Sequence, residues 1–80
     1  MSDNKSVEEK LFEIVGTVFK KDPKELSVTT SLRKDLQAKS INFIEIAAMM
    51  ESSFQKEFRI HKVIQAQTIG DLLAMSKDTA

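Results

Sequence analysis

The first quarter of the chain carries an apolar stripe with helical spacing. Apolar residues recur there at intervals of three and four: Val7, Leu11, Ile14, Val15, Val18 and Phe19. Ser6 and Glu9 form a capping-box pattern at the start, in which each side chain accepts from the other residue's amide. Gly16 is expected to weaken the helix by ~1 kcal/mol relative to alanine. Pro23 forces Asp22 out of the α region, so the pattern predicts an amphipathic helix that begins at Ser6 and stops at Asp22.

Residues 23–39 show no long periodic run and therefore predict a long loop. A loop of this length needs anchors if it is to be ordered within a compact domain. Four widely spaced apolar residues are expected to enter the core and hold it: Leu26, Val28, Leu32 and Leu36. Residues 30–36 are expected to form a short helical turn.

A second helix is predicted to begin at Lys39 or Ser40, and it is apolar over more than half of its circumference. We expect one buried stripe made of Ile41, Ile44, Ala48 and the 49–54 region. Four further residues widen this stripe: Phe43, Ile46, Ala47 and Met50. A helix with so wide an apolar surface is expected to lie centrally, against several neighbours.

Two more helices follow a polar linker. Residues 61–66 are predicted to form a short third helix, and Thr68 with Asp71 forms a capping-box pattern before the last one. Fraying is expected from Lys77 onward. Since no alternating β pattern is present, the fold class is predicted to be all-α. The expected architecture is a four-helix bundle of three longer helices and one short helix, with a long first loop, as one domain over residues 1–80 that is ordered over about 5–77.

Composition excludes several classes of function. The 80 residues include 12 basic and 12 acidic side chains, so a strongly basic nucleic-acid surface is not expected. Cysteine is absent, which excludes disulfides and thiolate metal sites. Residues 1–5 are polar and predict no signal peptide, and no apolar run approaches the ~20 residues that span a bilayer. We therefore expect a cytoplasmic protein with no membrane partner, and a monomer, because three helices can cover the central one.

Ser40 is the main candidate for chemistry, since it lies where the polar loop meets the second helix. Serine at a helix start commonly serves as an N-cap that contributes ~1 kcal/mol. A catalytic serine needs a base, and the one histidine, His61, lies in a polar connector where it is expected to face solvent. Glu45 and Glu51 are too far apart along a helix to form an acid–base pair. No metal-binding constellation is present either, so an enzyme is not expected.

The surroundings of Ser40 resemble the acyl carrier protein family. Residues 32–41 read LRKDLQAKSI, and they are followed by Ile44-Glu45 and by residues 51–54, ESSF. The family carries a DLGxDSL stretch, a glutamate five residues beyond the serine, and an acidic segment that ends in phenylalanine. Matching positions here are Asp35, Leu36, Ser40, Glu45, Glu51 and Phe54. The order and spacing of the helices extend the resemblance over nearly the whole chain.

The resemblance implies a carrier and not a catalyst. Ser40 would be esterified with 4'-phosphopantetheine from coenzyme A by a phosphopantetheinyl transferase. The thiol of that arm would hold acyl intermediates as thioesters for acyl-loading and acyl-processing enzymes of fatty acid, polyketide or related lipid biosynthesis. Candidate partner-docking residues are Lys39, Ile41, Glu45 and Glu51. Residues that could line an acyl pocket, or equally form ordinary core, are Ala47, Ala48, Met50, Phe58 and Val63.

The chain also departs from the family. Lys39 replaces the aspartate before the serine, Gln37 replaces a glycine, and Ile41 replaces a leucine. The family is strongly acidic, whereas this chain is neutral. These departures suggest a specialised carrier with its own partners instead of the housekeeping carrier. The alternative is a helical interaction module that keeps the carrier fold but is never modified.

Overall fold

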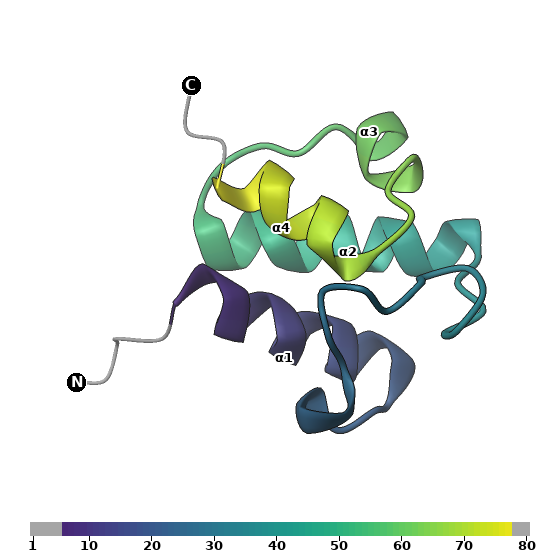
Figure 1. Ribbon diagram of the computed structural model, residues 1–80. Helices are drawn as coiled ribbons and strands as arrows, with labels where there is room; N and C mark the ends of the chain where they lie inside the picture. The colour runs from purple at the N-terminus through teal and green to yellow at the C-terminus, as the bar shows by residue number, and fades with distance from the viewer. Residues whose placement is uncertain (1–5, 78–80) are drawn as a thin grey trace.

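Residues 6–77 are described by a computed structural model, and most of them are helical (Figure 1). The elements in chain order are α1 (Val7–Phe19), a 3₁₀ turn η1 (Pro23–Glu25), α2 (Ser40–Phe54), α3 (Ile60–Ile64) and α4 (Ile69–Lys77). Within residues 6–77 the β structure is confined to an isolated bridge between Ser31 and Thr68. The predicted all-α fold, with three longer helices, one short helix and a long first loop, is confirmed.

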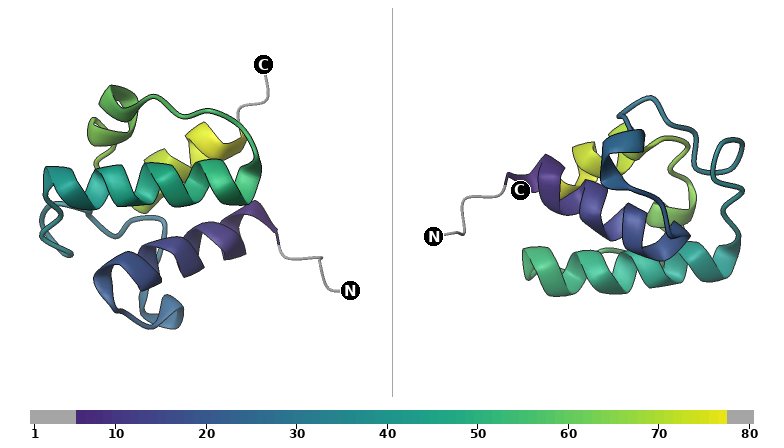
Figure 2. Two further views of the ribbon diagram at one scale, coloured as in Figure 1. Left: turned by 180° about the vertical axis from the view of Figure 1, so that it is seen from behind. Right: turned by 90° about the horizontal axis from the view of Figure 1, so that it is seen from below.

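The helices enclose one apolar core. α1 and α2 run antiparallel, α3 packs on α2 near the start of that helix, and α4 packs on α1 (Figures 1 and 2). Leu11 and Val15 of α1 are fully buried, and Ile69 and Leu72 of α4 meet them in the same cluster. None of the helices in residues 6–77 combines the length and the apolar character needed to cross a membrane.

α1 begins with the predicted capping box, in which the amide of Glu9 donates to Ser6 Oγ at 3.2 Å and the amide of Ser6 donates to Glu9 Oε1 at 3.0 Å. Gly16, however, is not simply a weak point in the helix. A Cβ there would lie 2.6 Å from the carbonyl oxygen of Lys21. The chain folds back this closely after α1 because residue 16 has no side chain.

α2 is central as predicted, but three residues of the stripe that was expected to be buried face solvent instead. Ile41 is 58% exposed and Ile44 46% exposed, and Ala48 is exposed as well. The residues that enter the core are those expected only to widen the stripe: Phe43, Ile46, Ala47 and Met50. Both sets have helical spacing, so periodicity could not decide between them. The inward set contains the large side chains Phe43 and Met50, which fill more of the core.

The long first loop is anchored at fewer points than expected. Leu32 is fully buried and Leu26 and Leu36 are half-buried, but Val28 is 39% exposed, so its predicted burial is wrong. Backbone hydrogen bonds hold this part of the loop instead. The carbonyl of Val28 accepts from the amide of Gly70 at 2.9 Å.

Residues 31–36 form hydrogen-bonded turns and not a helix, and the helical turn of this loop lies earlier, at η1. The amide of Asp35 donates to the carbonyl of Ser31 at 3.0 Å, and Asp35 Oδ2 accepts from the amide of Ser31 at 2.8 Å. The Asp35 carboxylate therefore holds its own loop together.

The two C-terminal helices follow the sequence pattern closely. α3 begins one residue earlier than predicted and ends two residues earlier. Before α4, the amide of Asp71 donates to Thr68 Oγ1 and the amide of Thr68 donates to Asp71 Oδ2, both at 3.2 Å, which confirms the second capping box. Lys77, where fraying was expected to begin, still belongs to α4. Predictions for residues 1–5 and 78–80 lie outside the described residues.

Candidate functional site

Ser40 is the first residue of α2, and its side chain is exposed. It is not the N-cap, because that position is held by Lys39 with extended backbone angles of −118° and 171°. The side-chain hydrogen bond of this helix start comes from Asn42, whose Oδ1 accepts from the amide of Lys39 at 2.9 Å. Within residues 6–77 the Ser40 hydroxyl has no hydrogen-bond partner. The common capping role of a serine at a helix start therefore does not apply here, and the Ser40 hydroxyl is free.

The electrostatic surroundings of Ser40 suit an anion. The first turn of α2 contains no acidic residue, and the start of a helix carries about half a positive charge from its unpaired amides. The exposed ammonium of Lys39 precedes the serine directly. A phosphodiester formed on Ser40 Oγ would lie where both features stabilise negative charge, so the residues present fit a phosphate-linked group.

Arg33 fixes the loop that leads to Ser40. Its Nη2 donates to the carbonyl of Ile64 at 2.9 Å, and its guanidinium carbon lies 4.9 Å from the centre of the Phe43 ring. One side chain thus connects the loop with the end of α3 and the first turn of α2. Sequence reasoning missed this role, because Ile64 is 31 positions away along the chain.

Gln37 lies where the resemblance has a glycine, and the backbone keeps the conformation that glycine favours. Its φ is 57°, in the left-handed region, which costs a residue with a Cβ about 1–2 kcal/mol. The loop before Ser40 therefore keeps its turn in spite of the substitution.

The candidate docking residues differ in what they contact. Lys39, at the N-cap of α2, and Ile41 and Glu45, on the first half of that helix, are exposed. Glu51 is also exposed, but its Oε2 accepts from the part-buried amide of Phe58 at 3.0 Å. Its carboxylate links the last turn of α2 to the following linker, which is a structural role. Within residues 6–77 no group of three His, Cys, Asp or Glu side chains could hold a metal ion.

The candidate acyl-pocket residues do not share one environment. The core contains four of them in its closed cluster: Ala47, Met50, Phe58 and Val63. Ala48 is exposed and lines a cavity of about 470 Å³ between α1 and α2, together with Val18 and Met49. Burial in the core is compatible with either an acyl pocket or ordinary packing, so the assignment stays a prediction.

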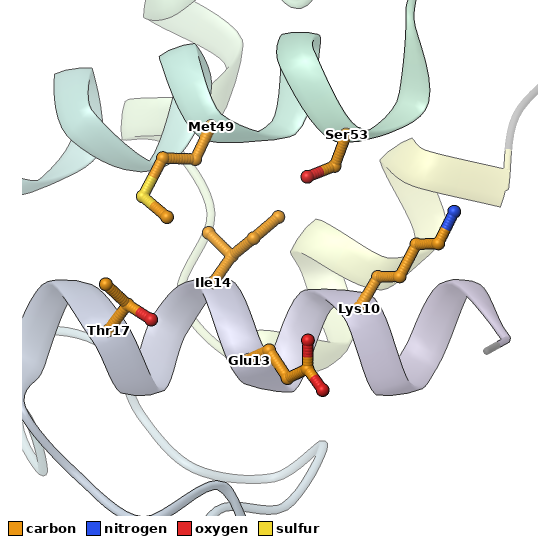
Figure 3. A pocket seen from close by; sticks show the side chains of 6 residues that line it. All are labelled: Lys10, Glu13, Ile14, Thr17, Met49 and Ser53. Carbon is orange, nitrogen blue, oxygen red and sulfur yellow. The ribbon is translucent and has the colours of Figure 1, made fainter. Parts of the chain in front are cut away.

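A second cavity lies beside this one, further along the same two helices (Figure 3). Its volume is about 330 Å³, and Met49 and Ser53 of α2 face Ile14 and Thr17 of α1 across it. Both cavities include Thr17 and Met49, so together they form an open groove along the α1–α2 contact.

Ser40 thus presents a free, exposed hydroxyl at the positive end of the central helix of a small helical bundle. The family described as "Phosphopantetheine attachment site" matches residues 9–76, and the chain belongs to this family. The resemblance to acyl carrier proteins is thereby confirmed, and the cofactor is covalently attached 4'-phosphopantetheine. A comparison with curated proteins gives no match.

Proposed function

We propose that Ser40 is the attachment residue, and that the protein holds acyl intermediates as thioesters on its phosphopantetheine arm. One observation carries the assignment: the Ser40 hydroxyl is exposed and without a hydrogen-bond partner among residues 6–77, at the start of α2. Such a hydroxyl can approach coenzyme A in a transferase without first breaking an internal contact. The family match supports the attachment chemistry.

The chain's own residues present and stabilise the arm and do not catalyse its transfer. When bound, the arm supplies a thiol that carries the acyl group. The α2 dipole and Lys39 stabilise the phosphodiester on Ser40 Oγ. Arg33 holds the preceding loop against α3 and α2, and the left-handed turn at Gln37 leads that loop toward Ser40. Phosphopantetheine carrier domains are generally non-catalytic, which agrees with this division of labour.

Intact-mass spectrometry tests the assignment. The protein is incubated with coenzyme A and a phosphopantetheinyl transferase of broad specificity, and we expect one phosphopantetheine increment. Ser40→Ala should abolish the increment. Ser52→Ala is the matched control, because Ser52 is another exposed serine of α2, and it should be loaded like wild type. An increment that persists in Ser40→Ala, or no increment on wild type, would overturn the proposal.

Within this function, the chain is proposed to be a specialised carrier of fatty acid, polyketide or related lipid biosynthesis, cytoplasmic and monomeric. Its proposed partners are a phosphopantetheinyl transferase and acyl-loading and acyl-processing enzymes. The support is Lys39 together with the net charge of zero, because partners of acidic carriers use basic surfaces. We expect Lys39→Asp to be loaded faster by a housekeeping transferase. Equal, fast loading of both proteins would remove the basis for specialisation.

The second candidate function is an unmodified interaction module with the carrier fold. Lys39 favours it, since a cation replaces the aspartate that the resemblance leads one to expect before the serine. The mass experiment separates the two functions, because the module would acquire no arm under any loading condition.

A further inference from the structure

The outer face of α2 beside Ser40 is apolar. Ile41, Ile44 and Ala48 follow helical spacing on the side away from the buried residues, and all three are exposed. Apolar side chains grouped on a surface in this way mark interaction sites. Ile41 directly follows Ser40, so an enzyme that modifies the serine would contact the start of this outer stripe of Ile41, Ile44 and Ala48.

Cations outnumber carboxylates in the segments at the Ser40 end of the molecule. Residues 33–45 and 59–64 contain five cations, Arg33, Lys34, Lys39, Arg59 and Lys62, against two carboxylates, Asp35 and Glu45. The loop before α2 and the short helix α3 both lie at the end of the molecule where α2 begins (Figures 1 and 2).

The two carboxylates leave these segments with a net charge of +3, five cations less two carboxylates. Asp35 directs Oδ2 to the backbone amide of Ser31, and Glu45 lines the α1–α2 cavity near Lys20. The positive end of the α2 dipole adds to the field of the five cations. These five residues are called the basic collar below.

We propose that the outer stripe and the basic collar form one docking surface for partner enzymes whose active-site entrance has an apolar floor and an acidic rim. This inference rests on the proposed function, since the partner reaches the stripe through Ser40. Charge complementarity selects the partner, because an acidic rim is attracted to the collar and a basic rim is repelled. Acidic carriers dock to partners with basic surfaces, so the charge proposed here for the partner's rim is opposite to the one that the resemblance implies.

Loading kinetics with two transferases test the charge of the rim. Both accept a broad range of carriers, but the surface around the coenzyme A pocket is acidic in one and basic in the other. With the acidic enzyme we expect Lys34→Glu/Lys39→Glu to lower kcat/KM about tenfold, and the wild-type rate to fall as salt is added. With the basic enzyme the double variant should instead be the better substrate.

Matched variants separate the effect of charge and apolar surface near Ser40 from the effects of net charge and of exposed apolar surface elsewhere. Lys39→Glu alone should also lower kcat/KM with the acidic enzyme. Lys77→Glu makes the same change of charge as Lys39→Glu, but it lies in the last turn of α4, at the other end of the molecule (Figure 1). It should leave kcat/KM unchanged. Ile41→Ser/Ile44→Ser should lower kcat/KM about tenfold with both enzymes, whereas Val28→Ser, which alters an exposed aliphatic residue of the first loop, should not.

Several outcomes would overturn the docking surface while the carrier function stands. The first is equal loading of wild type and Lys34→Glu/Lys39→Glu by both transferases. The second is faster loading of wild type than of this double variant by the transferase with the basic surface. The third is a kcat/KM that Ile41→Ser/Ile44→Ser leaves unchanged. A wild-type dimer in light scattering that Ile44→Ser dissociates would overturn it too, because the stripe would then be covered by a second copy. Failure of the carrier function looks different, since neither enzyme would then add a mass increment to Ser40.

Discussion

Within residues 6–77, three residues other than glycine have positive φ, and Gln37 is the one near Ser40. The other two, Lys20 and Gln55, end α1 and α2 in left-handed caps, where such a conformation is common. Gln37 instead lies within the loop before α2, three residues before Ser40. Its strain is local, so it can be removed without altering the rest of the loop.

We expect Gln37→Gly to stabilise the protein by about 0.5–1 kcal/mol, because the strain of a Cβ at φ 57° outweighs the entropy that glycine adds to the unfolded chain. The control is Gln65→Gly at φ −78°, where only the entropy acts and stability should fall. Urea unfolding of both variants measures the difference. A loss of stability at both positions would show that residue 37 is not strained.

Glu51 distinguishes a structural carboxylate from a docking carboxylate. Its Oε2 accepts from the part-buried amide of Phe58, so Glu51→Ala leaves that amide unpaired and should cost about 1–2 kcal/mol in unfolding free energy. Glu51→Gln keeps an acceptor oxygen and should cost less than half as much. Glu57→Ala, in the exposed linker, serves as the control. If Gln and Ala reduced stability equally, the charge and not the hydrogen bond would be the contributor.

At the scale of elements, the sequence predicted where helices start better than it predicted where they stop or which way they face. The first helix was expected to stop at Asp22, but α1 ends at Phe19 because the chain turns left-handed at Lys20. Ser6 and Thr68 open helices through side-chain bonds to residues three positions away, and such local bonds can be inferred from spacing. The orientation of α2 depends on what α1 and α3 present to it, and two apolar stripes on one helix gave no local signal. The contacts of Arg33 with Phe43 and Ile64 also depend on how separate elements pack, so spacing along the chain did not predict them.

Gly16 shows how a contact between elements overrides helix propensity. Propensity alone favours alanine over glycine by ~1 kcal/mol, but a Cβ would lie 2.6 Å from the Lys21 carbonyl oxygen. We expect Gly16→Ala to destabilise the protein by roughly 1–3 kcal/mol, because backbone has to move. Thr17→Ala, at the adjacent exposed position, should be neutral or slightly stabilising. A rise in the melting temperature of Gly16→Ala would show that the turn after α1 adapts freely.

At the scale of the whole molecule, two places could hold an acyl chain attached through Ser40. One is the closed core around Met50 and Val63, both 0% exposed. The other is the open groove between α1 and α2, where Ala48 and Met49 lie. A chain in the core gains more, since each methylene removed from water contributes ~0.8 kcal/mol. Val63 belongs to α3, which with five residues is the shortest α-helix within residues 6–77, so we expect α3 to be the element that moves to admit the chain.

We therefore expect an octanoyl group on the arm to raise the melting temperature above that of the unacylated holo form, and to slow amide hydrogen exchange in α3. An acetyl group should do neither, because it is too short to leave the arm and enter the core. Ala48→Gln fills the open groove without touching the core and should leave the octanoyl effect intact. If Ala48→Gln abolished the effect, the chain would lie in the groove, and Met50, Phe58 and Val63 would be packing residues alone.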